Sequence, residues 1–211
     1  MTKVLILGAS GQIARHVVSD LADDKQIDMT LFLREARRLA DRPARASVVQ
    51  GDVLDRALLD EAMAGQDLVY ANLTGADIDN QARSVIASME AADVKRLIFV
   101  LSLGIYDEVP GAFGAWNRRM IGEELKPFRR AADIIEASAL DYTILRPAWL
   151  TDEDEIDYET TAKGQPFKGT VVSRKSVAEL IADIIRSPAT HVHANLGIGK
   201  PGTDADKPYF M

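Results

Sequence analysis

Short apolar runs alternate along the chain with longer stretches in which apolar residues recur every third or fourth position. The short runs are continuous, which is typical of strands buried on both faces of a sheet, whereas the longer stretches indicate amphipathic helices. The expected strands are 3–7, 29–33, 47–50, 68–71, 96–101, 143–146 and 195–198. The expected helices are 12–22, 56–64, 81–92, 131–138 and 176–186.

This order predicts an α/β protein with a doubly wound parallel sheet, because strand–helix–strand units place helices on both faces of the sheet. The chain length suits one such domain over residues 1–211. Residues 103–127 and 147–169 interrupt the pattern, and the first stretch contains too many glycines and prolines for one helix. Both follow strands, so we expect irregular insertions on the substrate side, at the carboxyl edge of the sheet.

Composition excludes several classes of protein and site. A net charge of −7 disfavours general nucleic-acid binding, and the lack of cysteine excludes disulfides, thiolate catalysis and Cys-ligated zinc. Met1 is followed by no secretory signal pattern, and no apolar run approaches the roughly 18 residues that span a bilayer. We therefore expect a cytoplasmic protein, a monomer or homodimer, that acts on a small molecule without a nucleic-acid or membrane partner.

The most specific motif is the segment 8–14, Gly8-Ala9-Ser10-Gly11-Gln12-Ile13-Ala14, between the first strand and the first helix. Gly8 permits a tight turn, Gly11 lets backbone N–H groups approach a pyrophosphate, and the helix N-terminus attracts the phosphates. The glycines lie three apart and not in G-x-G-x-x-G spacing, so the motif alone also fits an ordinary turn. Its place in the first strand–helix unit favours dinucleotide binding by residues 8–13.

The end of the second strand indicates which dinucleotide is bound. Arg34 follows Leu33, and Arg37 and Arg38 come shortly after. A carboxylate here usually accepts from the ribose 2′-hydroxyl of NAD, whereas arginine accommodates the 2′-phosphate of NADP. Arg34 and Arg37 therefore favour NADP(H), with NAD(H) possible; a solvated basic loop is the alternative.

Six segments in order resemble the atypical short-chain dehydrogenase/reductase superfamily, in particular its NmrA-like group with flavin and biliverdin-IXβ-type reductases. The matching segments are 8–15, 33–34, 51–55, 65–70, 94–104 and 140–147. The resemblance implies a Rossmann-like fold with Asp52 and Val53 at the adenine. It also implies that Leu73, Thr74 and Gly75 border the ribose and pyrophosphate. Asp52 could instead cap the next helix, although Asp55 is better placed for that role.

The resemblance also places Ser102, at the end of the fifth strand, facing the substrate carbonyl as the candidate catalytic hydroxyl. Alternatively Ser102 satisfies backbone groups at the strand end. The superfamily normally uses Tyr-x-x-x-Lys, in which the phenol protonates the carbonyl, but no tyrosine here has a lysine four residues later. Alignment from 140–147 places Glu124 and Phe128 at those positions, so the usual proton donor is missing.

Three functions remain open. We favour an NADPH-dependent reductase of small conjugated or aromatic acceptors, flavin- or quinone-like, with protonation by solvent, Ser102 or the substrate. The missing Tyr–Lys pair favours the alternative, a non-catalytic NADP(H)-sensing regulatory protein. A nucleotide-sugar epimerase or dehydratase ranks third, because the segment after residue 147 is short for a sugar-binding domain.

No metal site is expected. The acidic run 152–155 lacks calcium-loop spacing and indicates a solvated lid, and His191 and His193 have no third ligand nearby in sequence. Trp116 and Lys126 could line the substrate pocket, although Lys126, which precedes a proline, is better explained as an exposed residue projecting from a turn.

Overall fold

The computed structural model describes residues 1–39 and 42–211, and this part of the chain forms one eight-stranded sheet and one two-stranded sheet. The strands of the large sheet are β1 (Thr2–Leu7), β2 (Ile27–Leu33), β3 (Ser47–Gln50), β4 (Leu68–Ala71), β5 (Arg96–Val100), β6 (Asp141–Pro147), β8 (Glu159–Ala162) and β10 (Ala194–Gly199). Their order is β3-β2-β1-β4-β5-β6-β10-β8. All neighbours are parallel except β8, which pairs antiparallel with β10.

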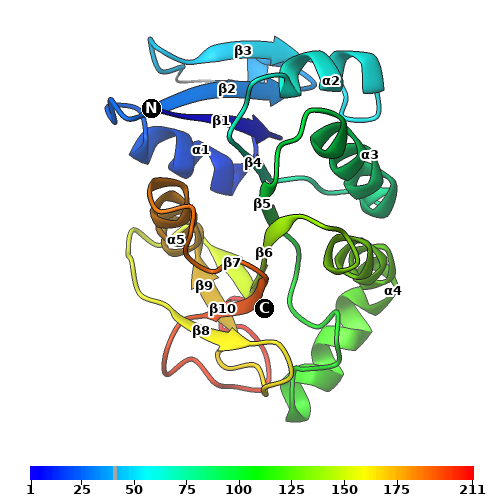
Figure 1. The fold of residues 1–211 in the computed structure, drawn as a ribbon. Coiled ribbons are helices and arrows are strands. Elements are labelled where there is room, and N and C mark those ends of the chain that lie inside the picture. The colour runs from blue at the N-terminus through cyan, green and yellow to red at the C-terminus, as the bar shows by residue number, and fades with distance from the viewer. Residues whose placement is uncertain (40–41) are drawn as a thin grey trace.

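Helices cover both faces of this sheet (Figure 1). α1 (Gln12–Asp20) and α5 (Arg174–Arg186) pack together on one face, and α2 (Arg56–Met63), α3 (Ile78–Ala91) and α4 (Gly111–Glu136) lie on the other. Each face has its own buried cluster of aliphatic side chains. The strand order reverses between β1 and β4, and this switch point is where doubly wound sheets open a crevice for ligands.

The predicted fold class is confirmed, and the expected strands all appear within two residues at either end. The structure adds the antiparallel edge strand β8 and a small sheet of β7 (Trp149–Thr151) and β9 (Val171–Ser173). These strands have three or four residues each, too few for a periodic pattern to mark them. The expected insertion 147–169 is therefore partly regular structure.

The prediction for residues 103–127 is wrong over most of its length. From Gly111 onward these residues belong to α4, a single helix of 26 residues. Gly114 is not a breaker here: a Cβ at that position would lie 2.0 Å from the Val109 carbonyl oxygen, so glycine allows the helix to pack closely. Pro127 is buried inside the helix, and it gives a cause for the bend in α4 seen in Figure 1.

Lys126 also differs from expectation, because it lies within α4 and does not project from a turn. Its side chain is exposed, as expected, and its Nζ atom is 2.6 Å from a carboxylate oxygen of Glu123, one helical turn earlier. Such an exposed pair contributes little to stability. Lys126 is therefore best described as a surface residue of the helix.

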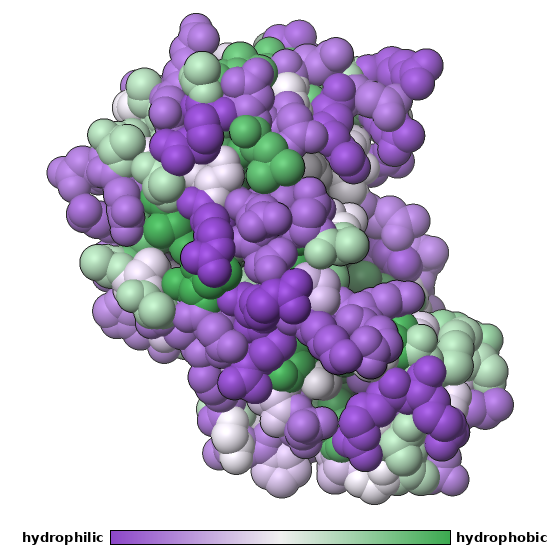
Figure 2. All heavy atoms as spheres, turned by 90° about the vertical axis from the view of Figure 1, so that its right-hand side faces the viewer, coloured by the Kyte–Doolittle hydropathy of each residue, from purple (hydrophilic) through white to green (hydrophobic). Residues whose placement is uncertain are grey.

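The outer surface is mostly polar on the side formed by α2, α3 and α4. Figure 2 shows hydrophobic residues there only in small separate groups. Within residues 1–39 and 42–211, no helix combines the length and apolar character needed to cross a membrane.

Candidate functional site

A cleft of about 460 Å³ opens at the switch point between the carboxyl ends of β1 and β4. It is bordered by the glycine turn, the end of β2, the loop after β3 and the loop after β4. Its lining residues are Gly8, Ser10, Gly11, Arg15, Phe32, Leu33, Arg34, Glu35, Arg38, Gly51, Asp52, Val53, Asn72, Leu73, Thr74, Gly75, Asp77 and Gln81. The motifs at the ends of the first four strands thus meet at one site.

The glycine turn packs directly against Asn72, at the end of β4. Gly8 has a φ of +74°, which favours glycine, and a Cβ there would lie 2.2 Å from the Asn72 carbonyl oxygen. A Cβ at Gly11 would lie 2.0 Å from Nδ2 of Asn72. Both positions therefore require glycine, and the close packing leaves the backbone of the turn open to a ligand.

The first turn of α1 faces this space with free backbone donors. The Arg15 N–H donates to the Gly11 carbonyl at 2.9 Å, which closes the first helical turn. The Gly11 N–H donates to the Gly8 carbonyl at 2.9 Å, whereas the N–H groups of Gln12, Ile13 and Ala14 have no acceptor among the described residues. Such a helix N-terminus favours an anionic oxygen by hydrogen bonding and by its partial positive charge.

Arginines gather at the other end of the cleft. Arg34 is exposed and makes no ion pair or hydrogen bond with any side chain among residues 1–39 and 42–211. Arg38 also lines the cleft, but its guanidinium lies 3.0 Å from Glu35, which partly neutralises it. Arg15 donates from Nη2 to the Arg38 carbonyl at 2.9 Å. Arg34 is thus the positive group most available to a ligand.

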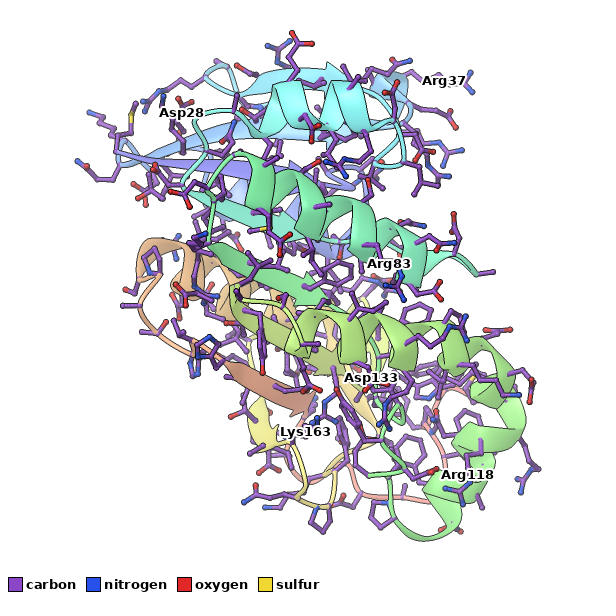
Figure 3. All side chains as sticks on the ribbon, turned by 45° about the vertical axis from the view of Figure 1, so that its right-hand side comes forward. Asp28, Arg37, Arg83, Arg118, Asp133 and Lys163 are labelled. Atoms are coloured by element: carbon purple, nitrogen blue, oxygen red, sulfur yellow. The ribbon has the colours of Figure 1, made fainter. Side chains whose placement is uncertain are left out.

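Arg37 binds the same carboxylate as Arg38 but does not line the cleft. Its side chain is 85 % exposed and pairs with Glu35 at 2.8 Å. It is not among the residues that line the cleft, and Figure 3 shows it at the outer rim of the molecule. Arg37 and Arg38 share the short 3₁₀ helix Ala36–Arg38, and their guanidinium groups pair with the two oxygens of the Glu35 carboxylate.

The loops on the far side of the cleft are held by hydrogen bonds. The Asp52 carboxylate accepts from the Leu54 N–H at 2.9 Å, and the Ser84 hydroxyl donates to the Val53 carbonyl at 2.5 Å. Asp55 caps α2 by accepting from the Leu58 N–H, as predicted. Asp52 thus stabilises a turn ahead of that helix and still faces the cleft.

The loop after β4 is fixed by Gln81 of α3. Its amide nitrogen donates to the Thr74 carbonyl at 3.1 Å and to the Asp77 carboxylate at 2.8 Å. This holds Leu73, Thr74 and Gly75 at the edge of the cleft. A preformed loop loses little conformational entropy when a ligand binds.

The structure brings most of the predicted cofactor-binding residues together. Of the glycine motif, Gly8, Ser10 and Gly11 line the cleft, whereas Ala9 and Ile13 are buried beneath it and Gln12 is exposed nearby. Sequence analysis did not assign the other nine lining residues to the cofactor, namely Arg15, Phe32, Leu33, Glu35, Arg38, Gly51, Asn72, Asp77 and Gln81. Helical spacing from Gly11 could have suggested Arg15; Asn72 depends on β4 lying beside β1.

Ser102 lies after β5 and outside the residues that line this cleft. It is half-buried, and its hydroxyl donates to the Leu103 carbonyl at 3.2 Å. Trp149 follows β6, and its ring centroid lies 4.9 Å from that of Trp116. Both rings pack against the cluster that contains Leu103. These aromatic faces belong to the substrate side of the sheet.

Tyr106 does not replace the missing tyrosine of the superfamily. Its hydroxyl accepts from the Asn195 amide at 2.8 Å, and burial, with the Glu136 charge, raises its pKa above the ordinary range. Glu124 is exposed on α4 and Phe128 packs into the core, so neither can act as a Tyr–Lys pair. No conventional proton donor is present among these groups.

The remaining polar candidates do not form a metal site. The acidic run 152–155 is exposed at Asp152, Glu153 and Asp154, and its carboxylates pair with basic residues at the start of α5 and with Lys200. His191 and His193 are exposed, as expected. In the described part of the chain, no group of three His, Asp or Glu residues could hold a metal ion.

Sequence comparison relates the chain to NAD(P)H-binding proteins, whose family model matches residues 8–188. An uncharacterized sugar epimerase of Bacillus subtilis, YhfK, is 29% identical over 196 residues, covering 85% of this chain and 86% of that protein. A (4-alkanoyl-5-oxo-2,5-dihydrofuran-3-yl)methyl phosphate reductase of Streptomyces griseus is 30% identical over 144 residues, covering 68% of this chain and 46% of that enzyme.

Solved structures agree with this relation. A Rossmann-fold NAD(P)-binding family protein from Shigella flexneri is 61% identical with a TM-score of 0.88, and each chain is covered completely. A short-chain dehydrogenase/reductase from Veillonella parvula in complex with NADP is 28% identical with a TM-score of 0.88, covering 99% of each chain. The fold, the glycine turn and the extent of these matches agree: the chain belongs to the NAD(P)H-binding family, with the Rossmann-like fold of the short-chain dehydrogenase/reductases.

Proposed function

We propose that this protein is an NADPH-dependent reductase of small conjugated or aromatic acceptors, such as flavins or quinones. The main supporting observation is the cleft at the switch point, which has the glycine turn at one side. At the other side lies Arg34, which pairs with no carboxylate of the described residues. This arrangement suits a dinucleotide with an anionic centre and a further phosphate on its adenosine ribose. The reductase of Streptomyces griseus supports the reaction class.

The chain's own groups would bind the cofactor in three places. Within residues 8–13, the N–H groups of Ser10, Gln12 and Ile13 would hold the pyrophosphate, since those of Gly8, Ala9 and Gly11 already donate to backbone carbonyls. Asp52 and Val53 would border the adenine. Arg34 would bind the 2′-phosphate by charge and paired N–H donors, with Arg37 and Arg38 behind it. Leu73, Thr74 and Gly75 would close the opposite side. The turn fits this role because any side chain at Gly8 or Gly11 would collide with Asn72.

The acceptor would lie at the carboxyl edge beside Ser102, where Trp116 and Trp149 offer partly exposed aromatic faces. When bound, the nicotinamide would supply a hydride to the acceptor, and one proton from solvent or the Ser102 hydroxyl completes the reduction. Ser102 would donate a hydrogen bond to the developing oxyanion. Flavin- and quinone-like acceptors suit this site because their reduced anions are stabilised and need no strong acid.

The second candidate function is a non-catalytic NADP(H) sensor. The specific observation in its favour is the absence of a competent Tyr–Lys pair, with Glu124 exposed, Phe128 in the core and Tyr106 held by Asn195. A nucleotide-sugar epimerase would need that pair as well and ranks below both, although the Bacillus subtilis relative is named a sugar epimerase.

An assay of NADPH consumption distinguishes the reductase from the sensor. Purified protein would be mixed with NADPH and a panel of flavins, quinones, dyes and nucleotide sugars, and loss of the nicotinamide absorbance followed. The reductase proposal expects saturable NADPH consumption with at least one conjugated acceptor and none without acceptor. Tight NADPH binding with no turnover across the panel would support the sensor and overturn the reductase.

A further inference from the structure

The side chain of Asn72 lies where the cofactor's phosphates would enter. It follows β4, and its backbone N–H donates to the Leu7 carbonyl at 2.9 Å, which extends the pairing of β4 with β1. Its Nδ2 atom is the nearest atom to the position of a Cβ on Gly11. The side chain is therefore fixed over the glycine turn and borders the cleft.

The orientation of the Asn72 amide is set by Tyr70. The Tyr70 side chain is fully buried, and its hydroxyl donates to Oδ1 of Asn72 at 3.3 Å. Among the described residues, Oδ1 of Asn72 is the acceptor for the buried Tyr70 hydroxyl. Leaving that hydroxyl without an acceptor would lower the stability of the fold. Burial also raises the pKa of Tyr70, so the hydroxyl stays protonated. Oδ1 must then face Tyr70, and Nδ2 must face the turn.

With this orientation, Nδ2 has two N–H donors that meet no protein acceptor within residues 1–39 and 42–211. Nδ2 lies beside Gly11, which directly precedes the first turn of α1, and both Asn72 and Gly11 line the cleft. Convergent donors without acceptors are the arrangement expected for an anionic oxygen.

We infer that Asn72 binds the pyrophosphate of the dinucleotide through Nδ2, and that Tyr70 is the positioning residue that turns this amide toward it. The inference rests on the proposed cofactor site and adds to it a side-chain donor from β4. It also gives Gly11 a second role, since a larger residue there would displace the amide as well as the phosphate.

Calorimetric titration tests this inference with two ligands, NADPH and adenosine 2′-monophosphate, which has the 2′-phosphate but no pyrophosphate. Asn72→Ala removes the donor and should weaken NADPH binding about tenfold to a hundredfold, the effect of one hydrogen bond to a charged group. Asn72→Asp keeps the shape but adds a negative charge and should weaken it further. Neither variant should change the affinity for adenosine 2′-monophosphate.

Two controls make the result specific. Asn80→Asp adds the same charge on the exposed surface of α3, outside the cleft, and should leave both affinities near wild type. Tyr70→Phe should weaken NADPH binding in the wild-type background and have no further effect in Asn72→Ala, because the two residues act through one amide. Circular dichroism would check that the variants fold.

The outcomes distinguish this inference from the cofactor proposal. If wild type binds both ligands and folded Asn72→Ala and Asn72→Asp bind NADPH as tightly, the role of Asn72 is refuted while the cleft stands. If wild type binds neither ligand, the cofactor site itself is wrong, and the inference fails with it. Equal losses for both ligands would also overturn it, since the effect would not belong to the pyrophosphate.

Discussion

Replacing Arg34 should remove most of the preference for NADPH over NADH. Arg34 lines the cleft and, among the described residues, has no carboxylate partner, so its full charge is available to a 2′-phosphate. One charge-assisted contact contributes about 1.5–3 kcal/mol, or roughly tenfold to 150-fold in affinity. Because Arg34 is exposed, salt should weaken the contribution.

The charges of Glu35 and Arg38, next to Arg34, affect how much of the NADPH preference is lost. Arg38 already pairs with Glu35, so it should sustain only a small residual preference in Arg34→Ala. Glu35→Gln should act in the opposite direction, because it removes a negative charge from the cleft and frees Arg38. Arg34→Lys keeps the charge but loses the paired donors, and should fall between wild type and Arg34→Ala.

Isothermal titration of NADPH and NADH into each variant measures these effects. Arg45→Ala is the matched control: it removes an equal charge near the start of β3, where the guanidinium contacts the Met1 sulfur at 3.9 Å. It should leave both affinities unchanged. The reasoning is refuted if wild type binds NADPH and NADH equally, or if Arg34→Ala keeps the wild-type preference.

Three further predictions concern the glycine turn, the candidate catalytic residue Ser102, and the ion pair between Arg130 of α4 and Asp79 of α3. Gly11→Val should abolish cofactor binding and keep a native-like circular dichroism spectrum, because the new side chain would occupy the position of the Asn72 amide. If calorimetric titration gives the variant a near-normal affinity for NADPH, the phosphates bind elsewhere. Ser102→Ala should lower kcat with an accepted substrate about tenfold to a hundredfold and leave NADPH affinity unchanged, because the hydroxyl would bind the developing oxyanion only during the reaction. An unchanged kcat would mean that solvent, and not Ser102, protonates the reduced acceptor. The Arg130 hydrogen bond lowers the pKa of the Asp79 carboxyl, so this ion pair should stabilise the fold fully above the ordinary Asp pKa and lose its effect as pH falls through the lowered value. Urea midpoints of wild type and Arg130→Ala should therefore differ at pH 7 and converge as acid protonates Asp79. A difference that does not shrink as the pH falls would contradict this.

The hydrophobic pattern predicted the sheet because buried parallel strands leave a strong local signal. The strands from β1 to β6 and β10 each contain such an apolar run, and the glycine turn follows from residues adjacent in sequence. Sequence analysis predicted only the last part of α4, as the helix 131–138, because Gly114 and Pro127 normally interrupt helices. Tertiary packing allows α4 to contain both residues, because Gly114 lies against the Val109 carbonyl and Pro127 is buried.

The missed site residues are those whose position depends on strand pairing or a side-chain direction. Asn72 faces Gly11 only because β4 pairs with β1, although the two residues are 61 positions apart by their numbers. The contrast between Arg37 and Arg38 depends on a 3₁₀ turn that periodicity does not reveal. Local chemistry thus predicted the location of the site, whereas the full set of its donors required the fold.

A crystal structure of the protein with NADP⁺ tests the central claim most directly. We expect the pyrophosphate within hydrogen-bond distance of the N–H groups of the glycine turn and the 2′-phosphate facing Arg34. The nicotinamide should lie toward Ser102 at the carboxyl edge. A dinucleotide bound elsewhere, or a cleft between β1 and β4 left empty at saturating NADP⁺, would contradict the account.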